Sequence, residues 1–299
     1  MSQNETHANQ TTQFTEREKI MSEKKTSLAP VITVAIQKGG SAKTTLAVNL
    51  AAELGAQGFN VLLIDVDPQA NASTHVCVAH PSTLSKNSSV LFRGSLEEIM
   101  ESIQIEANPG FENVHLIPGS LELDQSVEES LRNYSPRPYE EMRRRIGMLR
   151  EAYDVIIIDT PPSLRLLTGN ALAASTHYIV PIETSSQYPL YGVADLTAYI
   201  NRIKESINPE LINIGVLISR HDERRRACKA IFETVQEKIG NILPMVIHAG
   251  AKVGEASIAR MPIRKMEKDG KVTKDFEELA RYLIDKLGLA QGNQEASIN

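Results

Sequence analysis

The sequence predicts an α/β fold built on a doubly wound, mostly parallel sheet with helices on both faces. Short apolar runs rich in Val and Ile recur along the chain at the length of strands. Most of these runs are separated by stretches with helical spacing. The first two are joined by a glycine turn and a helix, which is the order of a right-handed βαβ unit. We therefore expect one large domain over residues 30–288.

The elements follow in a simple order. Residues 1–29 are polar and poor in aromatics, which predicts a mostly disordered tail. The run VITVAI (31–36) predicts a strand buried on both faces, the next helix ends near Gly58, and NVLLIDVD (60–67) is the second strand. Five further strands are expected at 114–119, 153–162, 177–183, 212–219 and 243–248. Residues 289–299 read as a frayed C-terminal tail.

Composition restricts the class of protein. Of 299 residues, 41% are hydrophobic and 23% are charged, which is ordinary for a soluble globular protein. The N-terminus lacks the basic and apolar regions of a secretory signal, and no apolar run reaches the roughly 18 residues of a membrane span. The two cysteines, Cys77 and Cys228, are far apart and have no CxxC partner. We expect a cytoplasmic protein with reduced thiols.

The glycine turn QKGGSAKTT (37–45) lies between the first strand and its helix. Such a turn directs backbone N–H groups and the positive end of the helix dipole at one point, which favours phosphate. Lys43 would reach the β- and γ-phosphates of a nucleotide, while the Thr44 hydroxyl would bind Mg²⁺. The turn therefore predicts a P-loop nucleotide site.

Three aspartates end strands at the same edge of the predicted sheet. Asp159 follows the four apolar residues 155–158 and closes their strand, where a Walker B carboxylate would hold the hydration shell of Mg²⁺. Asp65 and Asp67 end the strand that follows the P-loop helix, and both can face the ligand crevice. An aspartate at a strand end is often only a helix cap, but the convergence of three favours catalysis.

The motifs QKGG..KTT, DVDPQ.NAS and DTPPSLRLLTGNAL together closely resemble the ParA (Soj) family of deviant-Walker-A partition ATPases, along most of 31–287. The resemblance implies that Lys38 contacts the ATP of the partner subunit, so that ATP joins a face-to-face homodimer. It also implies that Asp67 positions the attacking water and that Asp159 supports the metal through water, with Asp65 as a candidate further metal ligand. The implied catalytic residues are Lys38, Lys43, Asp67 and Asp159, and the implied ATP-binding residues are Gly39, Gly40, Ser41, Ala42, Lys43, Thr44 and Thr45.

The loop departs from the family pattern at two positions. Ala42 replaces the glycine that precedes the second lysine, and Ser41 replaces the usual valine. If the backbone at Ala42 has positive φ, alanine costs on the order of 1 kcal/mol there. Our hypothesis is that Ala42 leaves nucleotide binding intact and slows turnover.

A basic region follows the sixth strand. Residues 219–274 carry thirteen Lys/Arg and seven Asp/Glu, which is a charge of +6. The rest of the chain carries −11, so the net charge of the whole chain is −5. Such a run is usually a solvated face, but the resemblance implies DNA binding without sequence preference, through phosphate contacts that weaken with salt. The expected DNA-binding residues are Arg220, Arg224, Arg225, Arg226, Lys229 and Lys252. Residues 1–29 are too few for a helix-turn-helix domain, so binding to a specific operator is not expected.

The resemblance implies an ATPase with ATP and Mg²⁺ as cofactors, which binds the nucleoid and is stimulated by a ParB-like partner. A plasmid, a chromosome origin or a protein cluster would fit as cargo. The alternative is a MinD-like ATPase on a membrane, but FEELARYLIDKLGLA (276–290) is balanced in charge and predicts a helix packed on its own domain. Cys77 and Cys228 do not fit an iron–sulfur scaffold like the nitrogenase iron protein. A decayed, non-hydrolysing ATPase is disfavoured because Asp67, Asp159 and both lysines are present.

Overall fold

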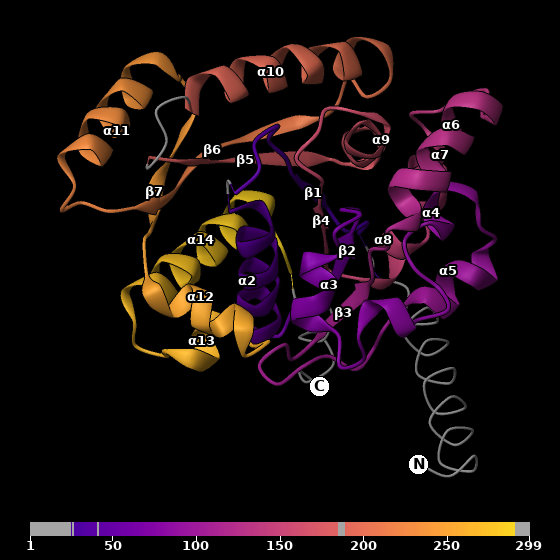
Figure 1. The fold of residues 1–299 in the computed structure, drawn as a ribbon, viewed down its shortest axis with the longest axis horizontal. Helices are drawn as coiled ribbons and strands as arrows, with labels where there is room; N and C mark the ends of the chain where they lie inside the picture. Colours follow the sequence, from indigo (N-terminus) through magenta and orange to yellow (C-terminus); the bar gives the residue numbers. More distant parts are fainter. Residues whose placement is uncertain (1–24, 26, 41, 185–188, 291–299) are drawn as a thin grey trace, which may run out of the picture.

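A parallel sheet of seven strands forms the centre of the computed structural model, which describes residues 25, 27–40, 42–184 and 189–290 (Figure 1). The strand order is β3-β2-β4-β1-β5-β6-β7, and all pairings in this sheet are parallel. The strands are β1 (Val31–Val34), β2 (Val61–Asp65), β3 (Val114–Ile117), β4 (Val155–Asp159), β5 (His177–Glu183), β6 (Ile212–His221) and β7 (Ile242–His248). The predicted doubly wound sheet and all seven predicted strands are confirmed.

The alternation of side chains along the strands explains how both faces are buried. In β2, Val61 and Leu63 belong to one core cluster, whereas Leu62 and Ile64 belong to another on the opposite face. A strand buried on both faces needs apolar residues at every position, because successive side chains point to opposite sides. This requirement accounts for the continuous apolar runs that the sequence shows.

Helices cover the two faces of this sheet. One face carries α2 (Lys43–Ala56), α3 (Asn71–Val76), α12 (Ala251–Ile258), α13 (Ile263–Met266) and α14 (Lys271–Leu287). The other face carries α4 (Val90–Arg93), α5 (Leu96–Ser102), α6 (Glu128–Tyr134), α7 (Glu141–Ile146), α8 (Leu149–Ala152), α9 (Leu166–Ala174), α10 (Pro189–Ser206) and α11 (Arg226–Lys238). The 3₁₀ helix η1 (Pro81–Thr83) and the π-helix η2 (Leu123–Val127) lie in the connections.

Helix α2 packs unusually closely against its surroundings. A Cβ added at Gly55 would lie 2.2 Å from the carbonyl oxygen of Glu112, so only glycine allows this approach. The helix ends where the sequence predicted, because Gly58 has a φ of 89° and its N–H bonds back to the carbonyl of Gly55. The C-terminal end of the helix that follows the phosphate loop is therefore fixed.

The ends of the domain pack on its surface. Of the predicted N-terminal tail, residues 1–24 and 26 lie outside the described residues, whereas Lys25 forms an ion pair with the buried Asp154. At the other end, the apolar face of α14, including Phe276, Leu279 and Leu283, is buried in the core, as predicted. Residues 291–299 lie outside the described part of the chain. Among the helices that the structure describes, none has the length and apolar character needed to cross a bilayer.

Candidate nucleotide-binding site

The glycine loop leaves β1, the central strand of the sheet, and turns directly into α2. Gly40 has a φ of 72°, and Ala42 has a φ of 62° with a ψ of 19°. Both residues therefore have left-handed backbone, which glycine adopts freely and which costs alanine roughly 1–2 kcal/mol. The backbone at Ala42 therefore has the positive φ at which alanine is strained. Ser41 lies outside the described residues.

Lys43 is the first residue of α2, and its side chain is buried. Its Nζ donates a hydrogen bond to the carbonyl oxygen of Lys38 at 3.0 Å, which ties the loop across its mouth. Burial lowers the pKa of Lys43, while the charges of Asp159 and Asp67 act in the opposite direction. A buried ammonium beside two carboxylates is well placed to exchange these contacts for phosphate oxygens.

The predicted metal end of the site is also assembled. The hydroxyl of Thr44 donates to Oδ2 of Asp159 at 2.7 Å. The other oxygen of Asp159, Oδ1, is buried and has no hydrogen-bond partner among the described residues. Burial, reinforced by the charge of Asp65, raises the pKa of Asp159 well above its ordinary value. A buried carboxylate with an unsatisfied oxygen beside a hydroxyl fits Mg²⁺, which prefers oxygen ligands and keeps several waters.

A cage of protein ligands is not required for such a metal. Among the described residues there is no group of three or more His, Cys, Asp and Glu side chains that could hold an ion. In P-loop sites, substrate phosphates and water supply most of the ligands of Mg²⁺. Thr44 and Asp159 therefore fit the part of such a site that a protein supplies, and their role as metal ligands stays a prediction.

The two aspartates after β2 have different surroundings. Asp67 lines the groove beside the loop, and its Oδ1 accepts a hydrogen bond from the Gln69 N–H at 3.0 Å. Burial raises the pKa of Asp67, and the nearby Lys43 opposes this rise. Asp65 is fully buried. Its Oδ1 accepts a hydrogen bond from the Asp67 N–H, and its Oδ2 accepts hydrogen bonds from the N–H and the hydroxyl of Ser73. Burial raises the pKa of Asp65 to about 6, and the role of this residue as a metal ligand stays a prediction.

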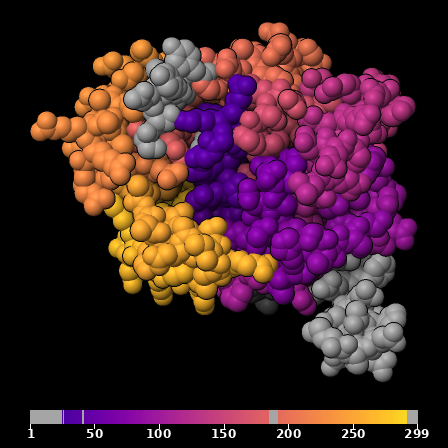
Figure 2. Space-filling model, viewed as in Figure 1, coloured from indigo at the N-terminus to yellow at the C-terminus, as the bar shows by residue number. Residues whose placement is uncertain are grey.

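Lys43, Thr44 and Asp67 share one groove of about 690 Å³, whereas Asp65 and Asp159 lie outside its lining. In the space-filling view, the indigo surface of the loop and α2 lies between the orange and yellow C-terminal part and the purple residues that follow β2 (Figure 2). The lining comes from the phosphate loop, from the segment after β2 and from the ends of β6 and β7. It includes Gly39, Gly40, Ala42, Lys43, Thr44, Thr45, Asp67, Gln69, Asn71, Thr74, His75, Ser219, Arg220, His248 and Gly250. The groove is large enough for a nucleoside triphosphate, by the usual volume of ligand pockets.

Arg220 differs from the other predicted DNA-binding residues. The structure places it on the wall of the nucleotide groove, where it has a φ of 51° and where its guanidinium lies 3.0 Å from the carboxylate of Glu183. Strained backbone of this kind is often found at functional sites. Arg220 thus lines the groove, and its predicted role in DNA binding stays a prediction.

The remaining predicted DNA-binding side chains, Arg224, Arg225, Arg226, Lys229 and Lys252, are all exposed. Arg224 and Arg225 lie 2.9 and 3.4 Å from the carboxylate of Asp222, and Lys252 lies 2.6 Å from Glu255. Exposed ion pairs of this type contribute little, about 0–1 kcal/mol. These cations can therefore leave their carboxylates for a phosphate backbone at small cost.

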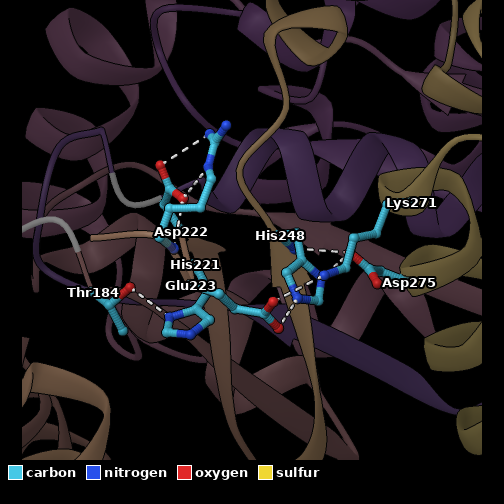
Figure 3. A network of polar contacts seen from close by, with 8 residues as sticks. Thr184, His221, Asp222, Glu223, His248, Lys271 and Asp275 are labelled. Atoms are coloured by element: carbon cyan, nitrogen blue, oxygen red, sulfur yellow. Dashed lines mark hydrogen bonds and ion pairs between the residues drawn. The ribbon is translucent and has the colours of Figure 1, made fainter. Parts of the chain in front are cut away.

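A polar network that sequence reasoning missed adjoins the groove at the ends of β6 and β7 (Figure 3). His248 lies between two carboxylates: its Nδ1 is 2.8 Å from Asp275 and its Nε2 is 2.9 Å from Glu223. Lys271 contacts the other oxygen of Glu223 at 3.3 Å. Next to this group, Nδ1 of His221 is 3.1 Å from the Thr184 hydroxyl. The sequence carried little signal of this network: His248 ends the predicted strand 243–248, but His221 lies two residues beyond the predicted strand 212–219.

A glycine loop at the central strand, followed by a lysine, a threonine and acidic strand ends, defines a P-loop nucleotide-binding protein. The chain belongs to the AAA domain family, whose sequence profile matches residues 29–213, and to its ParA (Soj) partitioning ATPases, as predicted. It is 31% identical over 259 residues to the chromosome partitioning protein ParA of Caulobacter vibrioides, covering 86% of this chain and 94% of that protein.

Two further comparisons give another relative and a solved structure of the same fold. An uncharacterized protein of Mycobacterium tuberculosis is 33% identical over 264 residues, covering 87% of this chain and 80% of that protein. Among solved structures, cobyrinic acid a,c-diamide synthase of Mycobacterium smegmatis, with bound ADP and magnesium, superimposes with a TM-score of 0.74 at 26% identity. This match covers 87% of this chain and 97% of the synthase.

Proposed function

We propose that this protein is an ATPase that acts as a switch in the partition of plasmid or chromosomal DNA. It binds ATP with Mg²⁺, dimerises on ATP, and in that state binds DNA of the nucleoid without sequence preference. A ParB-like partner accelerates an otherwise slow hydrolysis and thereby releases the protein. The observation that carries the proposal is the contact between Thr44 and the half-satisfied Asp159 at the head of α2, next to the buried Lys43.

Each residue of the loop has a defined task in this proposal. Lys43 binds the phosphates of its own nucleotide, and Lys38 reaches the nucleotide of the other subunit. Thr44 and Asp159 hold Mg²⁺, which supplies positive charge to the phosphates when bound. Asp67 lines the same groove and orients the attacking water through its carboxylate. Positioning and charge neutralisation are the main contributions that phosphoryl transfer needs from a protein.

The basic residues support a DNA-binding surface. Arg224 and Arg225 precede α11, Arg226 and Lys229 lie in its first turns, and Lys252 lies on α12. All five are exposed, and each phosphate contact they make releases counterions, so binding should weaken steeply with salt. A dimer presents twice as many of these cations, which raises the affinity through avidity. ATP would thus control DNA binding through dimerisation.

The alternative is a MinD-like ATPase that acts on a membrane or a protein cluster. A membrane anchor at the C-terminal helix would need an apolar face free for lipid. In α14, however, Phe276, Leu279 and Leu283 are buried against the domain. This packing favours the DNA proposal over the membrane alternative.

The test is binding to a random-sequence DNA duplex with ATP, ADP or no nucleotide, across a salt series. We expect binding with ATP alone, a steep decrease with salt, and loss of binding in Lys38→Ala. Lys229→Ala should weaken binding several-fold, whereas Lys238→Ala, at the far end of the same helix, serves as the matched control. DNA binding that ignores the nucleotide would contradict the switch. Absence of DNA binding in every state, with binding to anionic lipid vesicles instead, would favour the membrane alternative.

A further inference from the structure

A buried hydrogen-bond cluster joins the backbone of Asp67 to two distant segments of the chain. Its members are the carboxylate of Asp65, the hydroxyls of Ser73 and Ser88, and the backbone of Gly119, all of which are buried. They come from the end of β2, from α3, from the segment before α4 and from the loop after β3. The cluster therefore ties together the segments that surround Asp67.

The contacts of the cluster form a continuous chain. The Gly119 N–H donates to the Ser73 hydroxyl at 2.8 Å, and that hydroxyl donates to Oδ2 of Asp65 at 2.6 Å. The Ser73 N–H donates to the same oxygen at 2.9 Å. The other oxygen of Asp65 accepts the Asp67 N–H at 3.0 Å. The Ser88 hydroxyl, in turn, donates to the carbonyl of Asp65 at 2.7 Å.

Gly119 lies where a side chain would meet Asp67 and Asp65. A Cβ at this position would lie 2.8 Å from the carbonyl oxygen of Asp67 and 3.0 Å from Cγ of Asp65. Both neighbours are buried, so a methyl group at Gly119 would force the backbone of Gly119 or of Asp67 to shift. The N–H of Asp67 is thus held by Asp65, and its carbonyl accepts the Ala70 N–H at 2.9 Å in a space that leaves room only for glycine at position 119.

We propose that Ser73 and Gly119 are positioning residues for ATP hydrolysis, which act through Asp65 to fix the backbone from which the Asp67 carboxylate reaches the groove. The inference rests on the proposed ATPase function. The side chain of Asp67 is short, so its direction follows the backbone closely. A misplacement of about 1 Å in a group that positions a reactant can lower the rate roughly 100-fold. This gives the buried Asp65 a task that needs no direct contact with the metal.

A purely structural role for the cluster makes a different prediction. Removal of a buried hydroxyl would then lower stability and leave turnover per folded molecule unchanged. A positioning role lowers kcat while nucleotide affinity is kept, because Lys43 and Thr44 bind the nucleotide from another element. The ratio of kcat to affinity therefore distinguishes the two roles.

The experiment compares Ser73→Ala and Gly119→Ala with Ser73→Thr, which keeps the hydroxyl. Matched controls are Ser102→Ala, a buried hydroxyl that bonds within α5 to Ile99, and Gly147→Ala, where a Cβ would meet nothing within 4 Å. We measure phosphate release with Mg²⁺ and ATP, the affinity for a fluorescent ADP analogue, and the unfolding midpoint. We expect kcat to fall about 10-fold in Ser73→Ala and about 10- to 100-fold in Gly119→Ala, with affinity within about twofold of the wild type. Ser73→Thr should recover most of the rate.

Two outcomes would overturn the inference separately from the proposed function. An unchanged kcat in folded Ser73→Ala and Gly119→Ala would overturn it, and so would an equal loss of rate in the two control variants. A wild-type protein that releases no phosphate from ATP with Mg²⁺, while binding the ADP analogue, would instead overturn the proposed hydrolysis itself and the inference with it.

Discussion

The left-handed backbone of Ala42 leads to a quantitative prediction for Ala42→Gly. Alanine pays roughly 1–2 kcal/mol at a φ of 62°, and glycine removes this strain. Glycine also loosens the unfolded chain, which subtracts about 0.4–1 kcal/mol. The net gain in the free energy of unfolding is about 0.5–1 kcal/mol. At about 2–4 °C per kcal/mol for a domain of this size, Tm should rise by roughly 1–4 °C.

Turnover should change as well, whereas affinity should not. If the loop keeps the same φ with and without nucleotide, the strain cancels from the binding free energy. Turnover rises only if the transition state strains the Ala42 backbone further than the ground state does. A further strain of about 0.5–1 kcal/mol, which glycine would relieve, would raise kcat about 2- to 5-fold. Phosphate release and the affinity for a fluorescent ADP analogue measure the two quantities. An unchanged kcat in Ala42→Gly would refute the hypothesis that Ala42 slows hydrolysis.

Two other alanines serve as controls for the stability argument. Ala70 has a φ of 51°, so Ala70→Gly should raise Tm by a similar amount. Ala259 has a φ of −76°, so Ala259→Gly should lower Tm by the ordinary entropic penalty of glycine. A decrease in Tm for Ala42→Gly like that of Ala259→Gly would refute the strain.

Two further predictions concern side chains near the ends of α2. Burial raises the pKa of Glu53 from 4.5 to about 7, with Arg264 opposing the rise, so the folded state retains a proton that the unfolded chain releases. The resulting stability is present below pH 4.5 and is lost as the pH rises through 7, by up to about 3 kcal/mol. Urea unfolding from pH 5 to 8 should show this decrease in the free energy of unfolding in the wild type but not in Glu53→Gln. Glu112→Gln is the control, because Glu112 is exposed and lies beside Arg264, and it should keep the decrease. Equal slopes in all three proteins would contradict the assignment to Glu53. Thr44→Ala should raise the Mg²⁺ concentration for half-maximal ATPase activity about tenfold or more, and Thr44→Ser should restore it; an unchanged Mg²⁺ dependence would separate Thr44 from the metal.

The strands and the phosphate loop could be predicted because their signals are local. A strand buried on both faces needs a continuous apolar run, and a loop that approaches phosphate needs glycine next to a helix start. Lys43, Thr44 and Asp159 were therefore recognised, and the structure brings Thr44 and Asp159 into contact although 115 residues separate them.

The rest of the site depends on contacts that local patterns do not encode. Ser73 and Gly119 are 46 residues apart. Ser73 closes the motif DVDPQ.NAS, but the motif does not reveal that its hydroxyl meets the Gly119 N–H, and Gly119 only ends a predicted strand. The place of Arg220 on the groove wall depends on where its strand ends, and one residue of shift would have moved its side chain to the other side. The sign of φ at Ala42 likewise follows from how the loop joins α2. From the sequence, strain at Ala42 could be predicted only for the case that φ is positive.

The central position of β1 divides the sheet into two halves. On one side, β4, β2 and β3 carry Asp159, Asp65 and the loop with Gly119, whereas on the other side β5, β6 and β7 carry the connections with the basic side chains. The loop that leaves β1 is the seam between them. Arg220 and His248 nevertheless bring the second half to the groove wall. An exchange between relatives of α11 alone, which carries Arg226 and Lys229, should therefore alter the proposed DNA contacts and leave the groove intact.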